Sequence, residues 1–276
     1  MEKEICIVQA NCQGEPLLNR LAASPEFEAR YDCRLFTNYI KEPIPDELFG
    51  RCSLFLYQYL NPDWGEFASE HLLRKLPDSA RSLCLPNMFF KGYWPFWSGE
   101  LGFDYRCTHL DEIIALELPP EETILLFLRS DVTKRGLSDR MKASIQQERE
   151  REKHTPVKYL DFIVENYGRQ RLFNTVNHPG SILMNIAARG VLEQLDLQSA
   201  DEAVLEAMGE PFPEFEQPIN PKVAQANGWD FADPDTLYQV YGRKLTFARY
   251  IANYVIAKQQ GVADFIGFLQ GDQIVI

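Results

Sequence analysis

A short turn near the start of the chain, Asn11-Cys12-Gln13-Gly14, carries side chains suited to chemistry. Residues 4–9 before it are apolar and rich in β-branched side chains, which predicts a buried strand, and a helix is expected soon after the turn. A cysteine just ahead of a helix feels the positive end of the helix dipole, which favours the nucleophilic thiolate. Backbone N–H groups, or the amide of Asn11 or Gln13, could hold an oxyanion, and Gly14 would let a substrate come close. The alternative is a tight turn with Cys12 as a small residue.

A base for such a thiol has few candidates, because the chain has four histidines. Those at 71, 109 and 154 lie in helical stretches, two of them expected at the surface. His178 directly precedes a helical pattern, with Pro179 suited to the first helical position and Asn177 or His178 to the N-cap. A helix N-terminus disfavours imidazolium, so the ring would stay neutral and able to accept a proton. A purely structural cap remains the alternative. The carboxylate that would orient the ring stays open among Asp131, Asp161 and Glu165.

An aromatic loop at 86–97 also follows an expected strand. Asn87 is placed to give a side-chain amide to the same site, and Tyr93 or a tryptophan could stack on an adenine or a sugar ring. Its glycine and prolines forbid a regular element, which favours a groove lining, while its apolar density is equally compatible with core.

The most basic short loop lies at 129–136, in a chain that is otherwise acidic. Arg129, Lys134 and Arg135, together with Lys91 of the aromatic loop, are candidates for neutralising the phosphates of a cofactor. An ordinary charged connector is the alternative. The charged run 146–153 is interpreted as a solvated helix face.

Strands alternating with helices must position these residues. A parallel sheet is expected from strands at 4–9, 31–36, 53–59 and 81–85, with a helix at 64–76. Ligands bind at the carboxyl ends of such strands, where the cysteine turn and the aromatic loop lie. Gln58, in the third strand, and Asn177, next to His178, are further candidates for oxyanion or substrate binding.

The pattern changes beyond about residue 108. Helices are expected at 109–118, 120–129, 137–153, 156–168, 179–195, 200–208 and 242–260, with a long loop at 210–235. The sequence therefore predicts an α/β protein with a parallel, Rossmann-like sheet layer at 1–108. A mainly helical region at 109–276 would complete the same domain and its active site.

Composition narrows the classes of function. A net charge of −12 over 276 residues argues against nucleic acid or an anionic membrane as the main partner. No apolar run is long enough to span a bilayer, and the N-terminus has no signal-peptide pattern, so a soluble, cytoplasmic protein is expected. Six scattered cysteines without C-x-x-C spacing indicate a reducing compartment, with neither a disulfide framework nor a metal site. Whether a homo-oligomer forms stays open.

Taken together, these segments resemble the WcbI-like family of polysaccharide-biosynthesis proteins over roughly residues 4–195. The resemblance rests on Asn11-Cys12-Gln13-Gly14, Pro86-Asn87, Phe90-Lys91-Gly92-Tyr93-Trp94-Pro95, Arg171-Leu172-Phe173 and Asn177-His178-Pro179-Gly180. It implies a coenzyme A-binding acetyltransferase that uses acyl-CoA as co-substrate and a sugar or oligosaccharide of a capsular or other surface polysaccharide as acceptor.

The family is also similar in layout to SGNH-type hydrolases and acyltransferases, in which a nucleophile follows the first strand and a late histidine is the base. Carried over, Cys12 takes the nucleophile position, Asn87 the oxyanion asparagine and His178 the base. Two departures put the orienting carboxylate and covalent catalysis in doubt: cysteine replaces serine, and Thr175 stands where an aspartate precedes the histidine by three residues.

The hypothesis from sequence is acyl transfer from acyl-CoA to a sugar hydroxyl, either through an acyl-Cys12 intermediate or by direct activation of the hydroxyl by His178. One rival is an SGNH-like esterase or thioesterase with water as acceptor. Another is a protein that binds coenzyme A or a nucleotide without catalysis, and a sulfotransferase is a weaker third because no Gly-rich phosphate loop with lysine is present.

Overall fold

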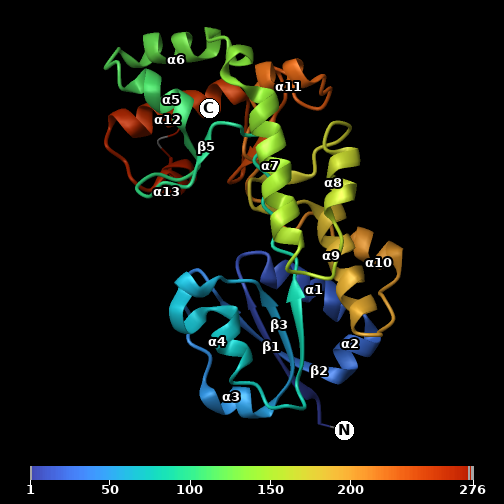
Figure 1. The fold of residues 1–276 in the computed structure, drawn as a ribbon. Helices are drawn as coiled ribbons and strands as arrows, with labels where there is room; N and C mark the ends of the chain where they lie inside the picture. Colours follow the sequence, from blue (N-terminus) through green and yellow to red (C-terminus); the bar gives the residue numbers. More distant parts are fainter. Residues whose placement is uncertain (1, 273, 275–276) are drawn as a thin grey trace. The chain divides into compact units, whose positions relative to one another are not determined.

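A four-stranded parallel sheet forms the N-terminal part of the chain in the computed structural model, which describes residues 2–272 and 274 (Figure 1). The strand order is β2-β1-β3-β4, with β1 paired to both β2 and β3 along most of its length. The strands span Glu4–Ala10 (β1), Tyr31–Thr37 (β2), Cys52–Gln58 (β3) and Arg81–Leu85 (β4). All four agree with the strands expected from sequence to within about a residue at each end. The predicted α/β fold with a mostly helical C-terminal half is confirmed.

The chain divides into two compact units, and each is described by itself. Unit 1 comprises the residues up to Phe89, Gln146–Glu165 and Asn177–Pro211. Unit 2 comprises Phe90–Ile145, Asn166–Val176 and the residues from Phe212 onward. The expected division at residue 108 differs from this one. Two later segments return to the first unit because they pack on the sheet, and such long-range packing has no local signal in the sequence.

Helices cover both faces of the unit 1 sheet. On one face Phe49 of α3 and Leu72 of α4 pack with Ile5, Ile7 and Phe55, which alternate along their strands as a half-buried pleat requires. Elsewhere in the unit α1 packs against α9, which also contacts β4. The helices of this unit are α1 (Gly14–Ala22), α2 (Pro25–Arg30), α3 (Asp46–Arg51), α4 (Ser69–Leu73), α9 (Ser181–Gln194) and α10 (Glu202–Ala207), with the 3₁₀ segment η1 at Pro62–Phe67.

A buried arginine fixes α1 to α9. The Nε of Arg20 donates to Oδ1 of Asn185 at 2.8 Å, and its NH2 group donates to the carbonyl oxygen of Gly209 at 2.9 Å. Burial lowers the pKa of Arg20, but a guanidinium remains charged at neutral pH. The helix that follows the Cys12 turn is therefore anchored to residues more than 160 positions later.

Unit 2 is built around a separate aromatic and aliphatic core. Phe103, Tyr250, Tyr254 and Phe265 lie at its centre. Its elements are β5 (Trp97–Ser98), β6 (Arg106–Cys107), α5 (Thr108–Ile114), α6 (Pro120–Arg129), η2 (Val132–Arg135), β7 (Phe173–Thr175), α11 (Pro221–Asn227), β9 (Tyr238–Val240), β10 (Arg243–Leu245), α12 (Phe247–Gln259) and α13 (Phe265–Gln270). Two helices, α7 (Leu137–Glu152) and α8 (Leu160–Asn166), have residues in both units.

Several expected helices differ in extent. The helix expected at 64–76 is divided into η1, which is kinked at Gly65 with a φ of 59°, and α4, which begins after Ala68 turns the backbone away with a ψ of 140°. The helix expected at 242–260 begins at Phe247, since the residues before it form the antiparallel β9–β10 hairpin. The long loop expected at 210–235 contains α11, which begins with Pro221 and is capped by the side chain of Asn220.

Among the described residues, no helix combines the length and apolar character that a bilayer crossing requires. The described part of the chain also contains no group of three or more histidine, cysteine, aspartate or glutamate side chains able to hold a metal ion. All six cysteines are free thiols in the structure.

Candidate functional site

Cys12 lies in the turn between β1 and α1, at the carboxyl edge of the unit 1 sheet. Its side chain is half-buried, whereas Cys6, Cys52 and Cys84 are buried within the sheet layer. The side-chain amide of Asn177 donates to the Cys12 Sγ at 3.5 Å. The two turns that sequence analysis singled out therefore meet within unit 1. Proximity alone does not assign a role to either residue.

The Cys12 turn is held by a network of side-chain amides that begins at Asn11. The backbone N–H of Asn11 donates to Oε1 of Gln58 at 2.8 Å, and its Nδ2 donates to Oδ1 of Asn87 at 3.1 Å. Its own Oδ1 accepts from the backbone N–H of Gln13 at 2.9 Å. Asn11 thus joins the loops that follow β1, β3 and β4, and it fixes the backbone on both sides of Cys12.

Gln13 is a positioning residue and is not placed as an oxyanion donor. Its side chain is only 2% exposed, and Nε2 donates to the carbonyl oxygens of Met88 at 2.7 Å and Asn177 at 3.0 Å. Its Oε1 accepts from the backbone N–H of Met88 at 3.2 Å. Both amide hydrogens are used inside the fold, which corrects the expectation that this amide could stabilise an oxyanion.

Gln58 has the same structural role at the end of β3. The side chain is 1% exposed, its Nε2 donates to the carbonyl oxygen of Pro86 at 3.0 Å, and its Oε1 accepts from Asn11. The Nδ2 of Asn38 approaches the same oxygen at 3.5 Å. The expectation that Gln58 contacts a substrate is corrected, because its amide is enclosed among the loops at the sheet edge.

Gly14 is required for packing inside unit 1. A Cβ at this position would lie 2.8 Å from the Ala10 Cβ and 2.8 Å from the Leu35 Cδ1. The missing side chain lets the start of α1 approach β1 and β2, so the expected role in close approach of a substrate is not the one that the fold explains.

Asn87 presents its amide group differently. Its Oδ1 accepts from Asn11, which orients the side chain. Among the described residues no hydrogen-bond partner occupies its Nδ2, and the residue lines a cavity of about 360 Å³ in unit 1. An oriented donor at the edge of a cavity is the geometry that binding of a carbonyl oxygen or an oxyanion needs.

His178 follows Asn177 directly and is half-buried. It lies in the short strand β8 (His178–Pro179), and α9 begins only at Ser181 with Gly180 as the N-cap. The expectation that Pro179 opens the helix and that Asn177 or His178 caps it is therefore wrong. Burial lowers the pKa of His178 to about 4, so the ring is neutral at pH 7 for a reason other than the helix dipole.

The cavity beside Asn87 contains residues that sequence analysis did not select. Tyr59 and His154 stack with ring centroids 3.7 Å apart, and Trp64 and Arg151 complete the larger side chains of the lining. Arg151 pairs with Glu148 at 2.6 Å. His154 is exposed at its surface, as expected, yet it also contributes an aromatic face to the cavity.

The charged run 146–153 is only partly a solvated face. Glu148 is completely buried and accepts from the backbone N–H of Phe89 at 3.0 Å, directly behind the loop that carries Asn87. Burial raises the pKa of Glu148 to about 7 against the opposing effect of Arg151. The helical spacing of Met141, Ser144 and Glu148, all buried, was the available signal for its inward orientation.

The remaining candidates belong to unit 2. Tyr93 is a core residue there: its side chain is completely buried, its hydroxyl lies 3.0 Å from the carbonyl oxygens of Tyr167 and Gln170, and its ring meets Trp94 and Trp229 edge to face. This packing favours the core alternative for this part of the aromatic loop, although Tyr93 also lines a cavity of unit 2, and its stacking on a ligand stays a prediction.

The basic candidates of unit 2 have local partners. Lys134 pairs with Asp131 at 3.4 Å, Arg135 pairs with Glu112 at 2.7 Å, and the Lys91 ammonium lies 5.0 Å from the centre of the Trp97 ring. Arg129 is exposed at the end of α6. Their role in binding phosphates stays a prediction.

The fold and the site together define an α/β protein with a cysteine turn at the carboxyl edge of a parallel sheet. The family model described as polysaccharide biosynthesis enzyme WcbI matches residues 5–200, well over half of the chain. The chain therefore belongs to the WcbI family of polysaccharide biosynthesis enzymes, which confirms the resemblance found in the sequence.

A solved structure of WcbI, described as a novel polysaccharide biosynthesis enzyme, shares the fold. The TM-score is 0.73 at 17% identity, over 98% of this chain and 100% of that chain. That protein is described as a native form without a disulfide bond between coenzyme A and one of its cysteines. No curated protein sequence matches this chain significantly.

Proposed function

We propose that this enzyme binds an acyl-coenzyme A with its thioester beside Cys12 and transfers the acyl group, an acetyl group in the simplest case, to a hydroxyl of a sugar. The observation that carries the proposal is the half-buried Cys12 thiol at the sheet edge with the Asn177 amide directed at its sulfur. Membership of a polysaccharide biosynthesis family supports a sugar acceptor. The description of a relative as a native form without a disulfide between coenzyme A and one of its cysteines supports the coenzyme, and it supports a position of the coenzyme beside a cysteine.

In the covalent form of the reaction, the Cys12 sulfur attacks the thioester carbonyl carbon and forms a new carbon–sulfur bond. The bond to the coenzyme sulfur then breaks, and the coenzyme leaves as a thiolate that takes up the proton received by His178 from Cys12. The amide of Asn177 stabilises negative charge on the attacking sulfur.

An oxyanion develops on the carbonyl oxygen during this attack. The Nδ2 of Asn87 is the proposed donor, because Asn11 holds its Oδ1 and leaves the amino group directed elsewhere. In the second half-reaction neutral His178 accepts the proton of the sugar hydroxyl, whose oxygen attacks the acyl carbon and releases Cys12 as a thiol. In a direct variant His178 activates the hydroxyl and Cys12 only shapes the site.

Intact-protein mass spectrometry after incubation with acetyl-CoA tests the covalent form. An added acetyl group that maps to Cys12, and that is absent from Cys12→Ala, is the expected result. Cys33→Ala is the matched control, since this second half-buried thiol lies in β2 and has no part in the proposal. Full transfer activity in Cys12→Ala would exclude the acyl-Cys12 intermediate and leave the direct variant.

The acceptor is tested separately by following release of coenzyme A with and without a sugar. Release that requires a sugar supports transfer, while equal release without one identifies a thioesterase that uses the same residues. Tight binding of coenzyme A with no release under either condition identifies a binding protein. His178→Asn should slow the release of coenzyme A if the protein is a transferase or a thioesterase, because both reactions need a proton acceptor. The same substitution should have no such effect in a binding protein.

A further inference from the structure

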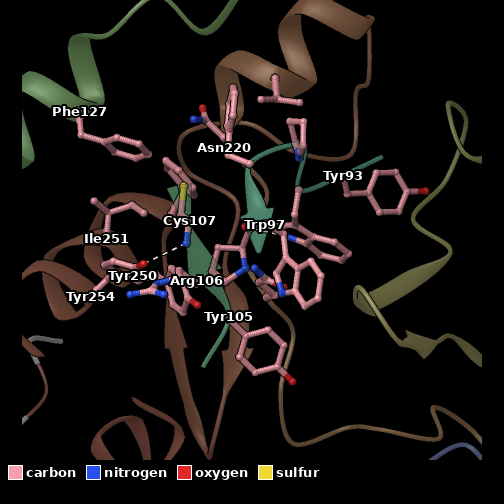
Figure 2. Close-up of a pocket in the computed structure, with 17 residues that line it drawn as sticks. Tyr93, Trp97, Tyr105, Arg106, Cys107, Phe127, Asn220, Tyr250, Ile251 and Tyr254 are labelled. Atoms are coloured by element: carbon pink, nitrogen blue, oxygen red, sulfur yellow. Dashed lines mark hydrogen bonds between the residues drawn. The ribbon is translucent and has the colours of Figure 1, made fainter. Parts of the chain in front are cut away.

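Unit 2 contains a cavity of its own, built from four parts of that unit. Trp97 and Arg106 come from the β5–β6 hairpin, Phe127 from α6 and Tyr250 from α12, and the segment before α11 closes the remaining side (Figure 2). None of these residues belongs to the Cys12 site.

Two buried polar atoms in the lining have no hydrogen-bond partner among the described residues. They are the hydroxyl of Tyr250 and Oε1 of Gln217, and these two residues are 4% and 5% exposed. A third such atom in the lining, Nε of Arg106, lies 2.8 Å from the Asp111 carboxylate in an ion pair and is not counted with them. Burial raises the pKa of Tyr250 well above its usual range, so the phenol remains protonated and can donate. Buried polar groups in native proteins are nearly always paired, so two such atoms in one cavity indicate that another molecule pairs with them.

The rest of the wall is mainly aromatic, with aliphatic side chains, Cys107 and Asn220 between the rings. Trp97 and Tyr105 are half-buried, which marks the side of the cavity that solvent reaches. Arg106 is the charged residue among the lining residues, and it pairs with Glu100 at 2.7 Å and with Asp111 at 2.8 Å. A ligand therefore meets aromatic faces and a few hydrogen-bonding groups, without an excess charge that would favour an anion or a cation.

Sugars fit this combination. Each hydroxyl can both donate and accept, which matches an acceptor at Gln217 and a donor at Tyr250, and the C–H groups of a sugar ring pack on aromatic faces. The cavity measures about 50 Å³. One water needs about 10–15 Å³ on this scale, so the cavity has room for about four waters. One edge of a sugar ring with its hydroxyls occupies a similar volume.

We propose that this cavity binds the edge of one neutral sugar unit, with Tyr250 and Gln217 hydrogen-bonded to its hydroxyls. The site goes beyond the proposed acyl transfer and does not depend on it. Its residues all lie in unit 2, whereas the acyl-transfer proposal uses Cys12, Asn87, Asn177 and His178 of unit 1.

Saturation-transfer NMR and calorimetry on the full chain, with methyl glucoside, methyl galactoside and methyl mannoside as probes, test the site. We expect saturable binding of at least one probe. Tyr250→Phe removes the hydroxyl and keeps the ring, so it should weaken that binding about three- to tenfold, the scale of one hydrogen bond. Tyr238→Phe is the matched control, since the Tyr238 hydroxyl is also buried in unit 2 but does not line the cavity.

The proposal is overturned if none of the three probes binds, in which case the cavity holds water only. It is also overturned if Tyr250→Phe binds as the unchanged protein does, or if Tyr250→Phe and Tyr238→Phe weaken binding equally. Binding that persists in Cys12→Ala keeps this test separate from acyl transfer: either proposal can fail while the other stands.

Discussion

The side-chain amide of Asn177 donates to the Cys12 Sγ across 3.5 Å and so joins two turns that are 165 positions apart in the chain. The carbonyl oxygen of the same Asn177 accepts from the Gln13 side chain, so two hydrogen bonds hold Asn177 to the turn that contains Cys12. Because an amide N–H can only donate, this arrangement is more favourable for a thiolate than for a thiol. Cys12 should therefore react more readily than it would without the Asn177 amide.

Replacement of Asn177 by alanine tests this relationship. The backbone carbonyl that accepts from Gln13 is retained, while the donor to sulfur is lost, so alkylation of Cys12 by iodoacetamide at pH 7 should slow about tenfold. Asn177→Asp should slow it further, because a carboxylate repels a thiolate. Peptide mass spectrometry resolves the sites, and alkylation of Cys33 in the same sample is the internal control. An unchanged rate at Cys12 in both variants would refute the role of the amide.

Gly14→Ala should destabilise unit 1. The added Cβ would lie 2.8 Å from both the Ala10 Cβ and the Leu35 Cδ1, so α1 or the strands must shift, at a cost of about 1–3 kcal/mol in the free energy of unfolding. Gly50→Ala is the matched control in α3, because its added Cβ meets no atom within 4 Å and alanine favours a helix. Urea unfolding measures both. Equal stability of the two variants would show that α1 accommodates the methyl group.

The sheet could be predicted because its information is local. Segments such as 31–36 and 81–85 are short, apolar and bounded by turn residues, and their boundaries in the structure differ from the expected ones by about a residue. Cys12 and Asn87 could be placed at the edge of the sheet for the same reason, since each closely follows such a strand. The helix near His178 was misplaced by two residues because Pro179 fits the extended strand β8 as well as it fits a helix start.

The roles of the polar side chains could not be predicted, because they depend on contacts between distant segments. In the sequence, Gln13 and Gln58 cannot be told apart from glutamines that bind a substrate. Only their hydrogen-bond partners, Met88, Pro86 and Asn11, identify them as structural. The burial of Glu148 could not be predicted from the sequence either. It stands in a run of charged residues, and its burial behind Phe89 follows from how α7 meets that loop.

Glu148→Gln should change how the stability of the protein depends on pH. The pKa of Glu148 is raised to about 7 in the folded protein, so the folded state holds a proton that the unfolded state releases above about pH 4.5. This group therefore makes the protein less stable as pH rises from about 4.5 to 7, by up to about 3 kcal/mol. The glutamine variant should lack this loss in urea unfolding between pH 5 and 8. The control Glu150→Gln, at an exposed position, should retain the loss of stability. If Glu148→Gln shows the same dependence on pH as the unchanged protein, the loss belongs to another group.

His178 should change the pH dependence of stability in the opposite direction to Glu148, over an overlapping range of pH. Its pKa falls to about 4 on burial, so the unfolded state binds a proton below about pH 6.5 that the folded state does not. This contribution lowers the free energy of unfolding as pH falls from about 6.5 to 4, by up to about 3 kcal/mol. It offsets the effect of Glu148, so His178→Asn should reveal a protein that becomes more stable on acidification from pH 6.5 to 4.5.

Exposed His71→Asn is the control for that variant and should leave the curve unchanged. The imidazole C–H signals in NMR measure the titration directly, and the signal that disappears in His178→Asn should have its midpoint near pH 4. A midpoint near 6.5 would mean that solvent reaches the ring. A ring with that pKa would be mostly neutral at pH 7 and a stronger base than a buried one, so this outcome would remove the predicted effect on stability and would leave His178 available as the proton acceptor.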